Sequence, residues 1–278
     1  MMTLTAEELK KAQFLMLKIL KVVHRVCEEN NIHYFLSDGT LIGAVRHNGF
    51  IPWDDDLDIG MLRADYEKFC EIAPKLLGDE YLLQNNKIDK GYGLQFSKVI
   101  LKDTLWIETS AEDTKREYSG LYIDIFPYDK VPSDVKIQKK HYKKYYFTNA
   151  LIFIKLKYNT FKRTKGLFRK LYFIYKWIIS RFYSLDSLFQ RRIALCTKFE
   201  NLSSDFVVTK YGGSFYKNQE PYDSYSILIK HVFEDAVFYV PEDYDTILSN
   251  LYGNYMELPP PEKRLNHGIK DFNFGMYK

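Results

Sequence analysis

In the first half of the chain, the apolar positions switch repeatedly between helical and strand spacing. Over residues 6–29 they recur every three or four positions, which predicts a long amphipathic helix behind a Thr5–Glu8 capping box. Next we expect a short strand over 33–37, a helix from Gly39 that Gly49 terminates, and a strand through the acidic residues 54–58. A helix over 64–77 then leads to strands predicted at 81–84, 94–101, 105–108 and 121–126.

The second half begins with a helical, aromatic and basic segment from about 134 to 199. Two strands, over 227–233 and 237–240, and a helix over 242–252 are expected after it. This order favours an α/β (α+β mixed) fold, with a mixed sheet flanked by helices and a helical insertion. We expect a core over 1–133, a basic aromatic helical subdomain over 134–200, and a C-terminal part over 201–278 that completes the core.

Four aspartates occupy five positions, 54–58, directly after Trp53. On an extended strand Asp54, Asp56 and Asp58 would share one face, where their charges repel one another. A divalent cation would remove that repulsion, and carboxylate oxygens suit Mg²⁺ or Mn²⁺. The alternative is a solvated acidic turn. The apolar neighbours of the run favour a metal or phosphate site, because burial of unpaired acids is costly.

Two further features point to phosphate chemistry. Gly39 and Thr40 open a helix, whose first N–H groups can donate to a phosphate. Asp124 is a lone acid in an apolar strand and is the natural third carboxylate; its alternative is a satisfied acid at a strand end. Asp38 beside the phosphate cradle would be unfavourable unless it faces away or binds the water shell of the metal.

Three motifs resemble the LicD family, whose fold is that of the nucleotidyltransferase superfamily: GTLIGAVRHNGFIPWDDDLDIGM, YIDIFP and YGNYMELPPPEKRLNH. Members of that family transfer phosphocholine from CDP-choline to a sugar of a surface glycan, and relatives transfer ribitol phosphate. The resemblance implies that Asp56, Asp58 and Asp124 are the catalytic metal ligands and that Gly39 and Thr40 lie against the donor's phosphates. Asp54 and Asp55 would tune the site or orient Arg46.

The resemblance therefore predicts metal-dependent transfer of phosphocholine to a teichoic acid, lipopolysaccharide or capsule precursor, with release of CMP. The alternatives are the same chemistry with CDP-ribitol or CDP-glycerol, and a non-catalytic membrane-associated scaffold. The three carboxylates argue against the scaffold.

Other candidates for substrate binding are polar or aromatic residues near the motifs: Arg46, His47, Trp53, Lys98, Tyr122, Arg264 and His267. Arg46 could grip a phosphate or interact with the helix C-terminus. Lys98 could reach the donor or face solvent. Trp53, Tyr122 and Tyr128 could form aromatic walls around choline, a quaternary ammonium.

The net charge of +4 conceals an uneven distribution: residues 136–192 hold sixteen Lys or Arg and one acid. Their aliphatic content disfavours nucleic-acid binding. An anionic membrane surface that carries a lipid-linked acceptor fits the pattern, as does a subdomain whose basic side chains cover its own core. Three distant cysteines, and the absence of a signal peptide or a membrane-spanning run, predict a cytoplasmic protein, soluble or peripheral at the inner membrane face.

Overall fold

The computed structural model describes residues 4–108, 118–158, 160–162, 164–203, 206–210, 219–266 and 268–277. The first half forms α1 (Ala6–Glu29), β1 (Phe35–Leu36), α2 (Asp38–His47), β2 (Asp58–Leu62), α3 (Arg63–Leu76), β3 (Tyr81–Gln84), β4 (Ser97–Leu101), β5 (Leu105–Glu108) and β6 (Tyr122–Pro132). The second half forms α4 (Val135–Lys155), α5 (Leu167–Arg181), α6 (Leu185–Cys196), β7 (Phe206–Thr209), β8 (Gln219–Pro221), β9 (Leu228–Phe233), β10 (Ala236–Pro241), α7 (Tyr244–Tyr252) and β11 (Ile269–Asn273).

The predicted mixed sheet is confirmed. Its strands follow the order β1-β2-β6-β4-β3, and the far end of β6 continues through β7 to β8. The β2–β6 pair is parallel, whereas β6 is antiparallel to both β4 and β7. Two small antiparallel ribbons, β9–β10 and β5–β11, complete the described strands.

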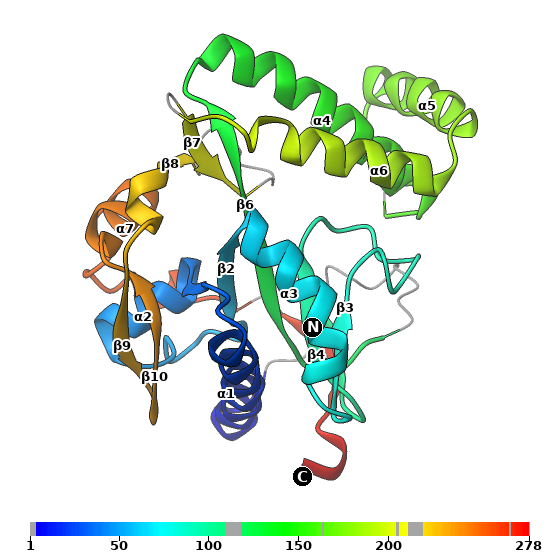
Figure 1. Ribbon diagram of the computed structural model, residues 1–278. Coiled ribbons are helices and arrows are strands. Elements are labelled where there is room, and N and C mark those ends of the chain that lie inside the picture. The colour runs from blue at the N-terminus through cyan, green and yellow to red at the C-terminus, as the bar shows by residue number, and fades with distance from the viewer. Residues whose placement is uncertain are drawn as a thin grey trace.

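Helices α1 and α3 cover one face of the sheet (Figure 1). The apolar stripe of α1, including Ile19, Val23 and Val26, is buried in the main core, and the Thr5–Glu8 capping box is present. Ile59 and Ile125 enter the same core from the sheet. Side chains alternate between the two faces of a strand, so their neighbours Asp58 and Asp124 point to the opposite face.

The strand expected at 54–58 begins only at Asp58, so that part of the prediction is wrong. A turn precedes it, in which the Asp54 N–H donates to the Ile51 carbonyl over 3.0 Å. The side-chain amide of Gln13 on α1 donates to the Asp54 carbonyl over 2.9 Å. The backbone at Asp54 is therefore bonded to a turn and to α1, and pairing in the sheet starts four residues later.

Helix α2 also ends differently from the prediction. Asn48, not Gly49, caps it in the left-handed conformation, at φ 54°. The short polar side chain of Asn tolerates this conformation better than most residues do. The turn brings Gly49 close to Glu234 of the β9–β10 ribbon, whose N–H donates to the Asn48 carbonyl.

Helices α4, α5 and α6 form a layer at one end of the sheet (Figure 1), as the helical pattern predicted. The expected boundary at 133 falls between β6 and α4, and the division into three parts stays a prediction. Across the described ranges, no helix combines the length and apolarity needed to cross a membrane.

Candidate active site

Three charged side chains stand in a row across neighbouring strands. Asp58 on β2 lies in register with Asp124 on β6, and Asp124 in turn lies opposite Lys98 on β4. Neighbouring strands are about 4.8 Å apart, so the three groups share one small area on the face opposite α1 and α3. The sequence-based pairing of Asp58 with Asp124 is thus realised by direct strand pairing.

Lys98 is buried at the centre of this row. Its Nζ donates to Asp124 Oδ1 over 2.7 Å, and the residue is only 3% exposed. The alternative in which Lys98 faces solvent is therefore wrong. The ammonium also lies 3.1 Å from the ring centroid of Tyr122. That face of Tyr122 thus already holds a cation, so it is closed to choline while Lys98 stays there.

Neighbouring acids contribute to a raised pKa of both Asp58 and Asp124. Burial raises the pKa of Asp58 well above its usual value, and the charges of Asp56, Asp124 and Asp54 add to the effect. Burial also raises the pKa of Asp124, to about 6, although Lys98 acts in the opposite direction. The cluster therefore contains more carboxylates than Lys98 alone can balance.

This donor set suits a divalent cation. The carboxylates of Asp56 and Asp58 interact closely enough to affect ionisation, and they supply the oxygen ligands that Mg²⁺ and Mn²⁺ prefer. Within the described part of the chain, however, no three His, Cys, Asp or Glu side chains are arranged as a ready-made metal site. Asp124 bonds to Lys98 through Oδ1, so a cation bound by a third carboxylate would share Asp124 with that ion pair or replace it.

Thr40 and Gly39 help to position two aspartates of the site, Asp58 and Asp54. The Asp58 N–H donates to Thr40 Oγ1 over 2.8 Å, and the Ser37 N–H donates to the Asp58 carbonyl. Thr40 thus fixes the first residue of β2. A Cβ at Gly39 would lie 2.9 Å from Asp54 Oδ2, so the missing side chain lets that carboxylate approach the N-terminus of α2.

Asp38 forms an ion pair with Lys210, and the Tyr252 hydroxyl donates to its other oxygen over 3.5 Å. This pairing explains how an acid can stand beside Gly39. The charges of Asp58, Asp54 and Asp56 contribute to a raised pKa of Tyr252, after burial, so its ring also lies near the acidic cluster. Sequence reasoning missed Lys210 and Tyr252; the one available signal was that Tyr252 opens the YGNY motif.

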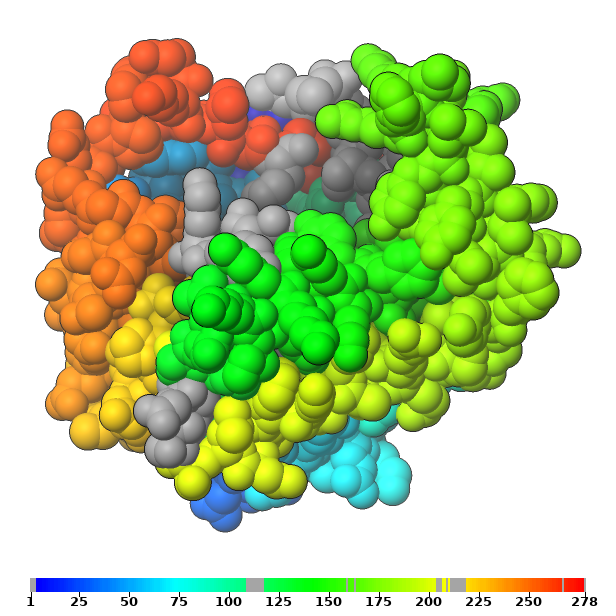
Figure 2. Space-filling model, turned by 90° about the horizontal axis from the view of Figure 1, so that it is seen from above, coloured from blue at the N-terminus to red at the C-terminus, as the bar shows by residue number. Residues whose placement is uncertain are grey.

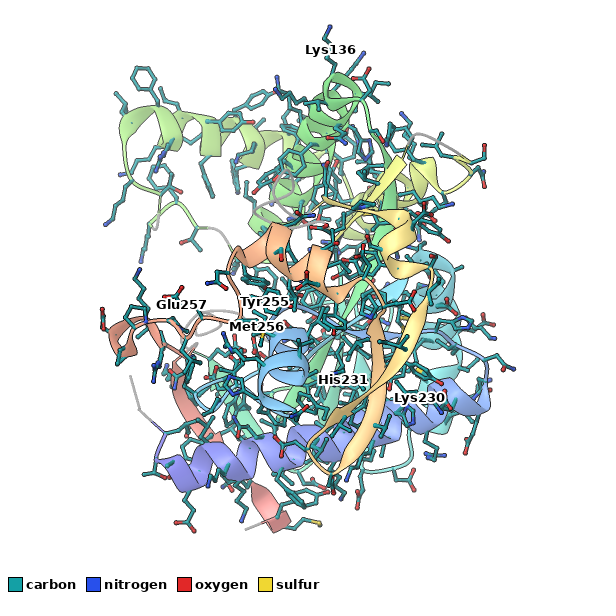
Figure 3. All side chains as sticks on the ribbon, turned by 90° about the vertical axis from the view of Figure 1, so that its left-hand side faces the viewer. Lys136, Lys230, His231, Tyr255, Met256 and Glu257 are labelled. Atoms are coloured by element: carbon teal, nitrogen blue, oxygen red, sulfur yellow. The ribbon has the colours of Figure 1, made fainter. Side chains whose placement is uncertain are left out.

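The C-terminal segment is tied to the end of α2. Arg46 donates through Nη1 to the carbonyls of Tyr255 and Glu257, and through Nε to His47 over 3.0 Å. Figure 3 shows the Tyr255–Glu257 segment next to α2. The guanidinium of Arg264 lies 5.0 Å from the ring centroid of Trp53. Arg46 therefore anchors this segment in the described structure, and a role in phosphate binding stays a prediction.

The remaining candidates differ in position. His47 lies edge-on to Trp53, 6.4 Å between ring centroids, and its pKa is lowered by burial and by Arg46. Tyr128 is buried between Phe35 and Tyr225, so its ring is part of the core and does not form a wall for choline.

His267 lies outside the described residues. Asp55 is only 3% exposed, less than Asp54, Asp56 and Asp58.

Figure 2 shows a hollow between the C-terminal segment, coloured orange to red, and the green helices α4 and α5. Atoms in the blue of the N-terminal part are visible at its floor. The C-terminal segment and the helical layer thus form two sides of an opening above the first half of the fold.

Comparison with known proteins identifies the family of this chain. Residues 31–166, which contain α2, β2 and Asp124, match the family model described as LicD/FKTN/FKRP, nucleotidyltransferase domain. The lipopolysaccharide cholinephosphotransferase LicD of Haemophilus influenzae is 33% identical over 273 residues, which cover 95% of this chain and 97% of that protein. The chain belongs to the LicD family. The ribitol 5-phosphate transferases FKRP of human and mouse are 31% identical to this LicD-family chain over 103 residues, 37% of the chain and 18% of each relative.

Proposed function

We propose that this protein transfers phosphocholine from CDP-choline to a sugar hydroxyl of a cell-surface glycan precursor and releases CMP. The observation that carries the proposal is the row of Asp58, Asp124 and Lys98 beside the N-terminus of α2. The full-length similarity to a lipopolysaccharide cholinephosphotransferase supports phosphocholine as the transferred group.

In the proposed reaction, the acceptor oxygen forms a bond to the choline-side phosphorus, and the bond from that phosphorus to the bridging oxygen breaks. CMP leaves with the electron pair of that bond, in line with the attack. The proton of the acceptor hydroxyl passes to a carboxylate. Asp124 suits this role because its pKa of about 6 allows it to be ionised and still accept a proton near neutral pH.

Asp56 and Asp58 would hold a Mg²⁺ or Mn²⁺ ion as primary ligands. Asp124 would either be the third ligand or stay bonded to Lys98 and act as the base, because ligation to the cation would lower its pKa. When bound, the cation would offset the charge of the pyrophosphate and of the departing CMP. Lys98 would keep a positive charge beside Asp124. If its ion pair with Asp124 opens, the Lys98 ammonium could contact the donor's phosphates. The N–H groups at the start of α2 would contribute to phosphate binding.

A second donor class deserves testing because the FKRP relatives are named as ribitol 5-phosphate transferases. The same carboxylates would serve CDP-ribitol or CDP-glycerol, since the pyrophosphate is common to all three donors. A quaternary ammonium needs aromatic faces. Tyr252 is the remaining candidate near the cluster. Trp53 could serve only if the Arg264 guanidinium left its ring.

We also propose that the acceptor is a lipid-linked precursor of lipopolysaccharide, teichoic acid or capsule, reached at the inner membrane face. The basic charge of 136–192 supports this location.

The deciding experiment measures CMP release from CDP-choline, CDP-ribitol and CDP-glycerol, each with Mg²⁺ and with EDTA. We expect metal-dependent release from CDP-choline with an acceptor extract. Turnover of CDP-ribitol without turnover of CDP-choline would show that the donor belongs to the second class. Undiminished activity of Asp58→Asn in EDTA would refute the metal-dependent mechanism.

A further inference from the structure

Helix α5 packs against α4 but buries very little of its own surface within the described structure. Of its fifteen residues, Ser180 alone is buried. Helices of water-soluble domains usually bury an apolar stripe against the core. The stripe of α5 faces outward: Phe168 is 86% exposed, Phe182 78% and Leu171 54%.

These exposed side chains form one continuous face. Leu167, Leu171, Ile174 and Ile178 follow the spacing i, i+4, i+7, i+11, which places them along one side of a helix. Phe168, Tyr175 and Phe182 recur every seven residues beside them. Lys170 and Arg181 border the face on one side, whereas Arg169 and Lys176 lie on the opposite side of the helix, where Lys176 lines a groove beside α4.

A basic groove adjoins this helix. It has a volume of about 580 Å³ and lies between α4, α5 and α6. Its basic side chains come from all three helices: Lys143, Lys144, Lys176 and Arg191. Tyr172 of α5 also lines it, so the groove borders the exposed helix directly.

We propose that α5 is an interfacial helix that inserts its outward apolar face into an anionic lipid surface. An apolar face bordered by Lys and Arg is the pattern of helices that lie in the headgroup region of a bilayer, and the adjoining groove suits the phosphates of anionic headgroups. Residues 135–185 contain no Asp or Glu, so no acid in this stretch opposes the attraction.

A second copy of the chain is the competing occupant of the face. A two-fold contact through α5 would bring the same basic borders of two molecules together, and like charges oppose that contact. An anionic membrane has the complementary charge. Helices α4 and α5 also form one side of the hollow in Figure 2, so a membrane bound at α5 would lie beside the opening through which a lipid-linked acceptor could enter.

Vesicle flotation with the full chain tests the proposal. Vesicles of phosphatidylglycerol and phosphatidylcholine in a 1:1 mixture are compared with pure phosphatidylcholine, at low and high salt. We expect binding to the anionic vesicles, weakened by salt, and a loss of about tenfold or more in the double variant Leu171→Glu/Phe182→Glu. The control Phe14→Glu/Met276→Glu adds the same charge at side chains 64% and 73% exposed and should bind like the parent.

Absence of binding at low salt, or equal binding of the two double variants, would overturn the proposal. So would a dimer in sedimentation that dissociates only in the α5 variant, since that result would assign the face to a second copy. Circular dichroism and thermal unfolding check that both variants are folded. Lipid binding does not depend on the donor, so the flotation result and the CMP-release result can fail separately.

Discussion

Lys98 on β4 donates to Asp124 on β6 over 2.7 Å, in the middle of the acidic cluster. Removing one partner of a buried ion pair leaves the other charge without compensation. The Lys98–Asp124 ion pair therefore affects both the stability of the sheet and the pKa of Asp124, the candidate base.

The variant Lys98→Met should lower the free energy of unfolding by about 3 kcal/mol near neutral pH. It should also raise the pKa of Asp124 above about 6, because burial would no longer be opposed. The pH–rate profile for CMP release should then shift to higher pH. As a control, Lys18→Met removes the exposed Lys18–Glu80 pair and should change stability by less than about 1 kcal/mol. An unshifted profile would exclude Asp124 as the base.

The variant Asp58→Asn should lose activity about 100-fold or more without losing stability in metal-free protein. Its charge lies among like charges, and neutralisation relieves that repulsion. Mg²⁺ should raise the thermal midpoint of the parent but not of the variant. Asp129→Asn is the matched control: Asp129 binds the buried guanidinium of Arg63 through two hydrogen bonds, so its loss should destabilise the fold. A midpoint that responds to Mg²⁺ in Asp58→Asn would contradict the ligand assignment.

Stability in EDTA should fall as the pH rises. A carboxyl whose pKa is higher in the folded state favours folding while it is protonated, so this contribution is present below the unfolded value of 3.8. For Asp124 it is lost as the pH passes about 6. Urea unfolding at pH 4.5 and 7 should show a smaller decline in Asp58→Asn/Asp124→Asn than in the parent. If stability falls equally in the parent and in the double variant between pH 4.5 and 7, Asp58 and Asp124 do not cause the pH dependence.

The variant Gly39→Ala should separate activity from stability. Alanine favours a helix over glycine by up to about 1 kcal/mol, so the fold should not lose stability. The new Cβ would lie 2.9 Å from Asp54 Oδ2 and displace that carboxylate, which should weaken Mg²⁺ binding and slow CMP release. In Gly43→Ala the Cβ would meet the Gly49 carbonyl at 2.5 Å, so that variant should lose stability instead. Unchanged kinetics in Gly39→Ala would mean that Asp54 has no part in the site.

The variant Arg46→Ala should free the Tyr255–Glu257 segment, because it removes hydrogen bonds to two of its carbonyls. We expect faster hydrogen exchange over 253–266 and a loss of about 1–3 kcal/mol of stability. Arg25→Ala, which removes an exposed bond to the Leu76 carbonyl, is the control and should leave that segment unchanged. If exchange is unaltered but the KM for the donor rises, Arg46 binds substrate directly.

Local patterns were sufficient for much of the fold. The strands at 81–84 and 105–108 have the predicted bounds, and α1 has its predicted cap, since each depends on neighbouring residues. The errors lie where distant parts meet. The backbone at Asp54 bonds to Ile51 and to Gln13 of α1, so an alternating acidic pattern did not form a strand there.

The sequence by itself determined that Asp58 and Asp124 stand among apolar strand residues, where acids need a compensating charge, and from this it predicted a place for both in the chemistry of the protein. The tertiary structure alone decided which lysine meets which acid. Strand pairing brings Lys98 to Asp124, and long-range packing brings Lys210 to Asp38 from 172 residues away. It also decided that the apolar face of α5 points outward, because the direction of a helix face depends on its neighbours and not on its spacing.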